Sequence, residues 1–332
     1  MAQVETVRGP IPVEELGTTL MHEHVFMVNP ELLDNHGDFW DEEVRVADAI
    51  ERLGELRARG VDTIVDPTVI GLGRHLPRIQ RVNAEVDINI VAATGLYAFH
   101  DLPQFLHYRG PGTPLGGPEP MTEMFVRDIR VGIADTGVKA AFLKCVVDEY
   151  LTPQVERVAR AVAAASVETG APITVHTNAE ARSGTAALTW FAEEGVDLTR
   201  VVVGHAGDSN DLDYLRSLAD QGAVLGCDRF GVDTINPTER RVATIAALAE
   251  QGYADRIVLS HDAWCYADLF AGEETMALVR QVLPNWNYLH ISDDVLPALR
   301  AAGVTDAQID MMLTGTPRRY FSGADAPEAA SG

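Results

Sequence analysis

Residues 140–177, AAFLKCVVDEYLTPQVERVARAVAAASVETGAPITVHT, contain two short apolar runs on either side of a segment with helical periodicity. The runs AAFLKCVV (140–147) and PITVHT (172–177) are apolar along most of their length, as are strands buried on both faces of a parallel sheet. The segment between them, 153–170, spaces its apolar residues as a helix does and closes with glycine, a common left-handed cap. The stretch therefore predicts a strand–helix–strand unit with parallel strands.

The same unit recurs along the chain. Six further apolar runs bring the number of predicted strands to eight, and they cover residues 16–25, 61–67, 88–95, 200–205, 222–228 and 256–262. Helical patterns lie between them, for example at 46–60, 183–195 and 211–222. Eight such units favour a single (β/α)₈ TIM barrel. A doubly wound open sheet is the alternative, and it is weakened because no glycine-rich dinucleotide fingerprint follows the first strand.

The remaining segments complete the predicted domain. VETVRGPIPV, before the first strand, is expected to form a hairpin that caps the barrel floor. Two long connections, 97–120 and a loop after strand eight at 263–288, are rich in aromatic residues, and we expect them to wall a pocket. We assign residues 1–323 to one domain, and the small, polar residues 324–332 to a disordered tail.

Composition excludes several classes of partner. The 332 residues carry a formal net charge of −23, which argues against nucleic acid and anionic membrane surfaces. No apolar run is long enough to span a membrane, and MAQVETVRGPIPVEELG lacks the basic and apolar regions of a secretory signal. Cys145, Cys227 and Cys265 are too widely spaced for a disulfide framework. We therefore expect a cytoplasmic protein.

Potential metal ligands gather at the ends of the predicted strands. Active sites of this fold lie at the C-terminal strand ends, where residues from different strands converge. The residues there are His22 and His24 on the first strand, His176 on the fifth, His205 on the sixth and Asp262 on the eighth. Imidazoles and a carboxylate suit a transition metal. Glu23, between the two histidines, is expected to point to the opposite face and to be structural.

Lys144 is the more specific clue. The chain has only two lysines, Lys139 and Lys144, among 26 lysine and arginine residues. An ammonium group inside AAFLKCVV would be costly to bury, and burial lowers the pKa of a lysine towards the neutral amine. A neutral lysine can take up CO₂ to form a carbamate (N6-carboxylysine), an anionic ligand able to bridge two metals. A lysine that reaches to the barrel rim is the alternative.

These residues carry a resemblance to a known family. The motifs MHEHV, AFLKCVVDE, TVHTNAE, VVGHAGDSND and LSHDAWC resemble the phosphotriesterase-like lactonases of the amidohydrolase superfamily. The likeness extends from about residue 3 to residue 322. It implies that His22, His24 and Asp262 bind a buried α metal and that His176 and His205 bind an exposed β metal. Carbamylated Lys144 would bridge both metals, and the family would form a homodimer.

The resemblance also implies a reaction. Asp262 is expected to pass a proton from the attacking water to the departing ring oxygen of a lactone, and Tyr97 to hydrogen-bond its carbonyl. Arg229 resembles the arginine that packs loops at the pocket mouth. The expected pocket wall includes Phe26, Leu72 and Trp264. Members of the family have various residues at the position of Trp264, so the tryptophan leaves the substrate preference open.

We therefore predict a binuclear hydrolase that opens acyl-homoserine or γ-/δ-lactones, an activity that would quench quorum sensing, with promiscuous organophosphate triesterase activity. Two divalent ions, Zn²⁺ first but also Co, Fe or Mn, suit this ligand set. A primary phosphotriesterase, another ester or amide hydrolase of the superfamily, and a barrel that only binds a ligand are the alternatives.

Overall fold

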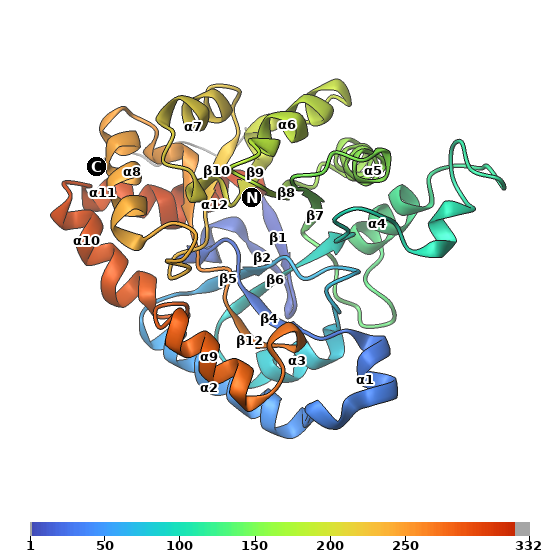
Figure 1. Ribbon diagram of the computed structural model, residues 1–332, viewed down its shortest axis with the longest axis horizontal. Coiled ribbons are helices and arrows are strands. Elements are labelled where there is room, and N and C mark those ends of the chain that lie inside the picture. Colours follow the sequence, from blue (N-terminus) through green and yellow to red (C-terminus); the bar gives the residue numbers. More distant parts are fainter. Residues whose placement is uncertain (1, 323–332) are drawn as a thin grey trace.

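A computed structural model describes residues 2–322 and shows eight parallel strands surrounded by helices. Figure 1 looks along the barrel, with helices arranged around the central strands. Strand order follows chain order in the eight-stranded sheet: β3 (Thr19–Leu20), β5 (Thr63–Asp66), β6 (Asn89–Gly95), β7 (Phe142–Val147), β8 (Ile173–Thr177), β9 (Val201–Gly204), β10 (Val224–Cys227) and β11 (Ile257–Leu259). The predicted TIM barrel is confirmed.

The first and last strands of the barrel are each interrupted. The first strand is interrupted after β3 and resumes as β4 (His24–Met27). The last strand is interrupted after β11 and resumes as β12 (Trp264–Ala267). β4 and β12 pair with each other in parallel, with Trp264 opposite His24. Lower down, the Met21 N–H donates to the carbonyl of Leu259 at 3.3 Å. These contacts bring the two ends of the sheet together and nearly close the barrel.

The helices cover the outside of the barrel. They are α1 (Pro30–His36), α2 (Glu42–Ala58), α3 (Leu76–Glu85), α4 (Pro120–Arg130), α5 (Pro153–Thr169), α6 (Ser183–Glu193), α7 (Leu212–Ala219), α8 (Thr238–Glu250), α9 (Glu273–Val282), α10 (Leu296–Ala301), α11 (Asp306–Asp310) and α12 (Thr316–Ser322). α5 begins at the Thr152 hydroxyl, which accepts from the N–H of Val155, and it ends at Gly170 in the left-handed conformation (φ 75°), as its sequence predicts. No helix among residues 2–322 is long and apolar enough to cross a bilayer.

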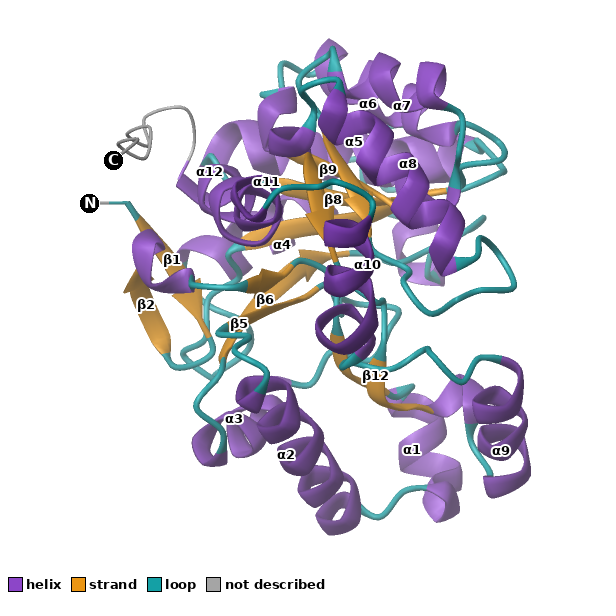
Figure 2. Ribbon diagram, turned by 90° about the vertical axis from the view of Figure 1, so that its left-hand side faces the viewer, coloured by secondary structure: helices purple, strands orange, loops and turns teal. Residues whose placement is uncertain are grey.

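The predicted N-terminal hairpin is present as β1 (Gln3–Thr6) and β2 (Gly9–Pro12), which pair antiparallel. Figure 2 shows it at one end of the barrel, with α1 and α9 towards the other. Val4 of the hairpin packs in a cluster with Phe142, Val202 and Tyr320. Because side chains alternate along a strand, Lys144 shares the inward face of Phe142. The predicted tail, residues 324–332, lies outside the described residues.

Candidate metal centre

The side chains predicted as metal ligands come together at the C-terminal ends of the strands. His22 lies in the break between β3 and β4, His24 begins β4, Lys144 lies in β7 and His176 in β8, and all four are at most 5% exposed. His205 directly follows β9, and Asp262 lies in the irregular segment after β11. Both have a left-handed backbone, with φ values of 64° and 55°. Non-glycine residues adopt this conformation rarely, and such strained positions concentrate at functional sites.

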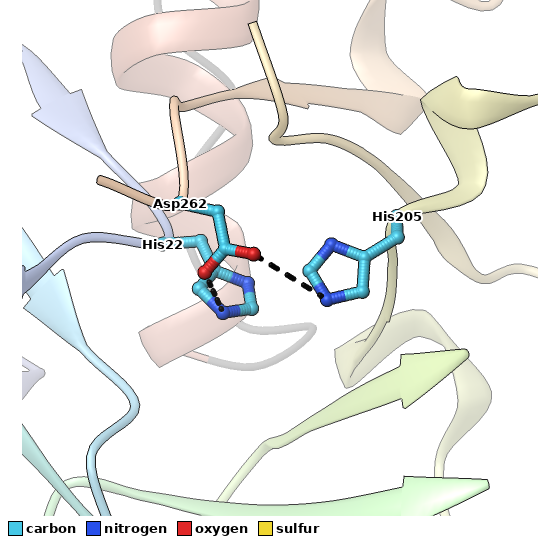
Figure 3. A group of neighbouring side chains, drawn as sticks. All are labelled: His22, His205 and Asp262. Carbon is cyan, nitrogen blue, oxygen red and sulfur yellow. Dashed lines mark ion pairs between the residues drawn. The ribbon is translucent and has the colours of Figure 1, made fainter. Parts of the chain in front are cut away.

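The donor atoms form two neighbouring groups. In the first, the Asp262 Oδ1 lies 3.4 Å from the Nε2 of His22 and 3.3 Å from the Nε2 of His24. In the second, the Nδ1 of His176 lies 2.9 Å from the Nε2 of His205. Asp262 joins them, because its Oδ2 lies 3.9 Å from the His205 Nε2. Figure 3 shows the carboxylate with one oxygen directed to His22 and the other to His205, and donor atoms of these three residues all lie within 4.8 Å of one another.

Each histidine is oriented through its other ring nitrogen. The Nδ1 of His22 and the Nδ1 of His205 both lie against Asp228, at 3.1 and 2.9 Å. The Nδ1 of His24 lies 2.7 Å from the Thr68 hydroxyl, and the Nε2 of His176 lies 2.9 Å from the Asp148 carboxylate. Histidines that bind metals in proteins are held in this way, which fixes the ring orientation and the tautomer. The histidine set therefore fits divalent ions, and this cluster could bind metal.

Burial favours the neutral imidazole at His22, His176 and His205. It lowers the pKa of His176 to about 4, although the hydrogen bond that His176 makes with the Asp148 carboxylate opposes this shift. It also lowers the pKa of His205 well below its ordinary value, and that of His22, where neighbouring Lys144 adds to the effect. Burial by itself raises the pKa of the Asp262 carboxyl. Attraction to His22, a hydrogen bond with His24, and attraction to His205 and Arg229 outweigh burial and hold this pKa well below its usual range. Neutral imidazoles and an ionised carboxylate are the forms that bind metals.

Lys144 points into the same cluster. It is 1% exposed, and its Nζ lies 3.4 Å from the Nε2 of His22. Burial lowers the pKa of its ammonium group to about 8, although the carboxylates of Asp262 and Asp228 oppose the shift. The strand alongside passes very close, because a Cβ at Gly95 (φ 146°) would lie 1.8 Å from the Lys144 carbonyl oxygen. Glycine in β6 therefore allows β7 to hold this lysine where it is.

Two of the predicted substrate residues also lie at the cluster. The Tyr97 hydroxyl is 3.2 Å from the Nδ1 of His176. The Arg229 Nε donates to the Oδ2 of Asp262 at 3.1 Å, and its Nη1 donates to Asp208 at the same distance. Arg229 thus contacts a predicted ligand directly, in addition to joining two loops.

The three apolar residues predicted for the pocket wall are placed differently from one another. Trp264 is 8% exposed and stacks on Phe270, with ring centroids 4.8 Å apart, while Trp286 packs edge-on against it at 4.1 Å. Leu72 is partly buried in the loop after β5. Phe26 packs edge-to-face against Trp40 and is 3% exposed, which places it in the hydrophobic core and not on an open wall.

Several residues at the cluster were not predicted. Asp228, Asp148 and Thr68 orient the histidines, and Phe99 lies with its ring centroid 5.5 Å from that of His176 while remaining 39% exposed. Asp228 ends the seventh predicted strand, so its position carried the same signal as the ligands. Phe99 follows Tyr97 by two residues, which is the spacing of one strand face.

Known proteins resemble this chain along almost its whole length. Residues 2–321 match the model of the Phosphotriesterase family. A "phosphotriesterase homology protein" of Mycobacterium tuberculosis is 58% identical over 323 residues, covering 97% of this chain and 98% of the relative. An "aryldialkylphosphatase" of Saccharolobus solfataricus is 34% identical over 316 residues, covering 95% and 98%. The solved structure titled "Structure of the phosphotriesterase from Mycobacterium tuberculosis" superposes with a TM-score of 0.93 at 58% identity, covering 96% of this chain and 98% of that chain.

Proposed function

Since this chain belongs to the phosphotriesterase family and is a hydrolase of the metal-dependent type, we propose that it opens lactone rings at a centre of two divalent cations. His22, His24 and Asp262 would hold one cation and His176 and His205 the other, with a carbamate on Lys144 between them. The observation that carries this proposal is the preorganisation of the four histidines. Their donor atoms face one another, and the opposite nitrogen of each ring is already engaged.

Bound divalent cations supply Lewis acidity and lower the pKa of a water molecule towards neutrality. The chain's own residues would position the substrate and move the proton. The Tyr97 hydroxyl, which lies 3.2 Å from the Nδ1 of His176, would hydrogen-bond the substrate carbonyl oxygen, where negative charge develops during attack. Burial, with Asp262 nearby, raises the pKa of this hydroxyl, so that it stays a hydrogen-bond donor.

Asp262 is the proposed proton carrier. Its Oδ1 is directed to His22 and His24, while its Oδ2 accepts from Arg229, so each oxygen has a separate set of partners. The carboxylate would accept a proton from the attacking water and deliver it to the departing ring oxygen. Arg229 would hold the carboxylate in the orientation that this transfer requires.

The mouth of the site suits an uncharged, partly apolar substrate. Phe99, whose ring lies against that of His176, is 39% exposed, and Tyr150 is 54% exposed. Trp264 lies opposite His24 in the pairing of β12 with β4 and stacks on Phe270. A formal net charge of −23 disfavours anionic substrates, whereas lactones and phosphotriesters are neutral. We propose acyl-homoserine lactones first and simple γ- or δ-lactones second, with quorum quenching as the biological outcome.

Organophosphate triesters are the second candidate substrate class. The observation that favours them is the similarity to the Saccharolobus solfataricus relative, an "aryldialkylphosphatase". A tetrahedral phosphorus centre resembles the intermediate of ester hydrolysis, so one site could serve both reactions. We propose that this activity is promiscuous and slow in this chain.

A substrate panel tests the assignment. The metal-loaded enzyme is assayed with lactones of several acyl lengths, paraoxon, a simple aryl ester and an aryl amide. The proposal expects kcat/KM to be highest for a lactone. A higher kcat/KM for paraoxon would mean that the protein is a primary phosphotriesterase. A higher kcat/KM for the amide would mean that it is an amide hydrolase.

The proposal also covers the chain as a whole. We propose that residues 1–323 form one hydrolase domain, that the protein is a cytoplasmic homodimer, and that Zn²⁺ is the first metal to test, followed by Co, Fe and Mn. The dimer is implied by the resemblance alone. Light scattering coupled to size-exclusion chromatography gives the mass in solution and would reject the dimer if it corresponded to 36.0 kDa.

A further inference from the structure

The seam where the first and last strands meet is the part of the barrel without regular strand pairing. β3 and β11 are the outer members of the eight-stranded sheet, and β4 pairs with β12 beyond them. Between these pairs lie the irregular residues 21–23 and 260–263. His22 and Asp262 fall in these two segments, and His24 directly follows the first. All three ligands proposed for the α metal therefore depend on how this seam is held.

A single buried carboxylate, that of Glu23, joins the two sides of the seam. Its side chain is fully buried. Its Oε1 accepts from the Ser260 hydroxyl at 2.8 Å and from both the backbone N–H and the Nδ1 of His261, at 2.9 and 2.6 Å. Its Oε2 accepts from the Ala263 N–H at 3.1 Å. Four donors satisfy this carboxylate in a place where ladder hydrogen bonds would otherwise run.

These bonds fix the backbone immediately on both sides of Asp262. Glu23 accepts hydrogen bonds from the N–H of His261, which precedes Asp262, and from the N–H of Ala263, which follows it. The N–H of Asp262 itself donates to the His22 carbonyl at 3.0 Å. Asp262 is left-handed (φ 55°), a conformation that a non-glycine residue keeps only where its surroundings impose it. Glu23 supplies two of the bonds that impose it.

His261 connects this hydrogen-bond network to the helical segment Ile291–Val295. Its Nε2 accepts from the Ile291 N–H at 2.9 Å, so the ring proton must lie on Nδ1, where it is donated to Glu23. The Ser260 hydroxyl, the other side-chain donor, also accepts from the N–H of His22 at 2.9 Å. Each partner of Glu23 is thereby fixed from a second direction, so that the carboxylate sits in a rigid frame.

We propose that Glu23 is a positioning residue that sets the affinity of the His22, His24 and Asp262 group for its cation by fixing the backbone of Asp262. The inference rests on the proposed function, because it concerns the same centre. It differs from a purely structural role, in which Glu23 would stabilise the barrel seam without altering how tightly a cation binds.

The test isolates one cation site. In the His176→Ala background, which has lost a ligand of the other group, the dissociation constant for Co²⁺ is measured by chelator competition with and without Glu23→Gln. The glutamine is isosteric, but its amide would direct an N–H group at the Ala263 N–H. We expect Co²⁺ to bind about tenfold or more weakly, the range found when residues that support metal ligands are changed. Thermal unfolding of the metal-free proteins is recorded in parallel.

Thr174→Val is the matched control. Thr174 is fully buried and hydrogen-bonded to the Tyr320 hydroxyl at 2.9 Å. It lies on the same face of β8 as His176, but two residues nearer the N-terminal end of the strand. The Thr174→Val substitution is expected to lower the unfolding temperature and to leave the Co²⁺ dissociation constant unchanged. If Glu23→Gln behaves like this control, Glu23 is structural only and the inference is wrong.

Two further outcomes are distinguishable. If the His176→Ala parent and the wild-type protein both bind no Co²⁺, the proposed function fails and the inference falls with it. If Glu23→Gln does not fold, Ser260→Ala replaces it in the comparison. That substitution removes one of the four bonds to Glu23 and also the bond that Ser260 accepts from the His22 N–H. It is expected to weaken Co²⁺ binding about threefold or more, as for the loss of one or two hydrogen bonds, and unchanged binding would overturn the inference.

Discussion

At the scale of single residues, Lys144 is the side chain on which the proposed bimetallic centre depends most. A carbamate would offer an oxygen to each cation, whereas arginine offers only donors and alanine offers nothing. Lys144→Arg and Lys144→Ala should therefore lose most bound metal. The fall in kcat/KM should exceed the roughly 10- to 100-fold typical of changes beyond the ligands themselves. Metal content and lactone hydrolysis are measured together, and short carboxylic acids should partly restore the alanine variant.

The chain offers a matched control for this prediction. Lys139, its only other lysine, is 39% exposed and pairs with Glu5 at 3.6 Å. Lys139→Arg should keep both metal and activity. Wild-type metal content and activity in Lys144→Arg would show that no carbamate is needed.

Asp228 gives a second prediction at this scale. One carboxylate engages a ring nitrogen of His22 and of His205, and it also accepts the backbone N–H of His205 at 2.8 Å. An asparagine has only one acceptor oxygen, so Asp228→Asn should release one of the two imidazoles and weaken metal binding by about 10- to 100-fold. Chelator competition measures the affinity. Asp233→Asn, which alters a partly buried carboxylate bound to Thr238 and Asn285, is the control and should bind metal normally.

Single residues also show where prediction from the sequence stops. Five of the six predicted ligands could be found because each lies at or near the end of a predicted strand and has a side chain suited to metals, and Lys144 because it is a lysine inside an apolar run. Asp228 also ends a predicted strand, but its orienting role could not be found, because its partnership with His22 spans 206 positions in the chain and depends on distances across the barrel. Phe26 follows the same alternation as His22 and His24, yet its ring packs against Trp40 in the hydrophobic core.

At the scale of elements, we propose that the segment after β11, expected to wall the pocket, forms a groove for the acyl chain of the substrate. Trp264 begins β12 and stacks on Phe270, and Trp286, which follows helix α9, packs edge-on against Trp264. Trp264→Ala should flatten the rise of kcat/KM with acyl length, to which each buried methylene contributes at most about 0.8 kcal/mol. The assay uses a series of acyl-homoserine lactones. Trp264→Phe keeps a stacking ring and should retain the rise, and an unchanged length dependence in Trp264→Ala would place the groove elsewhere.

The elements themselves were largely predictable. All eight barrel strands lie within a few residues of their predicted ranges, because buried parallel strands are apolar runs and the helices between them have clear periodicity. The interruptions at 21–23 and 260–263 were not predictable, since they depend on left-handed Asp262 and on hydrogen bonds that Glu23 accepts. Helix α9 and strand β12 were expected as loop. No residue of α9 is buried, so its sequence lacks a clear apolar face, and β12 is buried but has only four residues.

At the scale of the whole molecule, the buried histidines predict how stability depends on pH. The pKa of His176 falls from 6.5 to about 4 on folding, so the unfolded chain binds more protons between these values. The free energy of unfolding of the metal-free protein should therefore decrease as pH falls from 6.5 to 4, by on the order of 3 kcal/mol for this residue alone. Urea unfolding across this range measures it. His176→Asn should show a shallower decrease, and an equally steep one would contradict the assignment.

The central claim is that this molecule holds two cations in one centre. It is tested most directly by elemental analysis of wild-type protein purified without chelators. The proposed ligands divide into two groups that Asp262 joins and that a carbamate on Lys144 would bridge. The account predicts about two divalent ions per chain, both retained in the active enzyme. A ratio near one in fully active protein would contradict it.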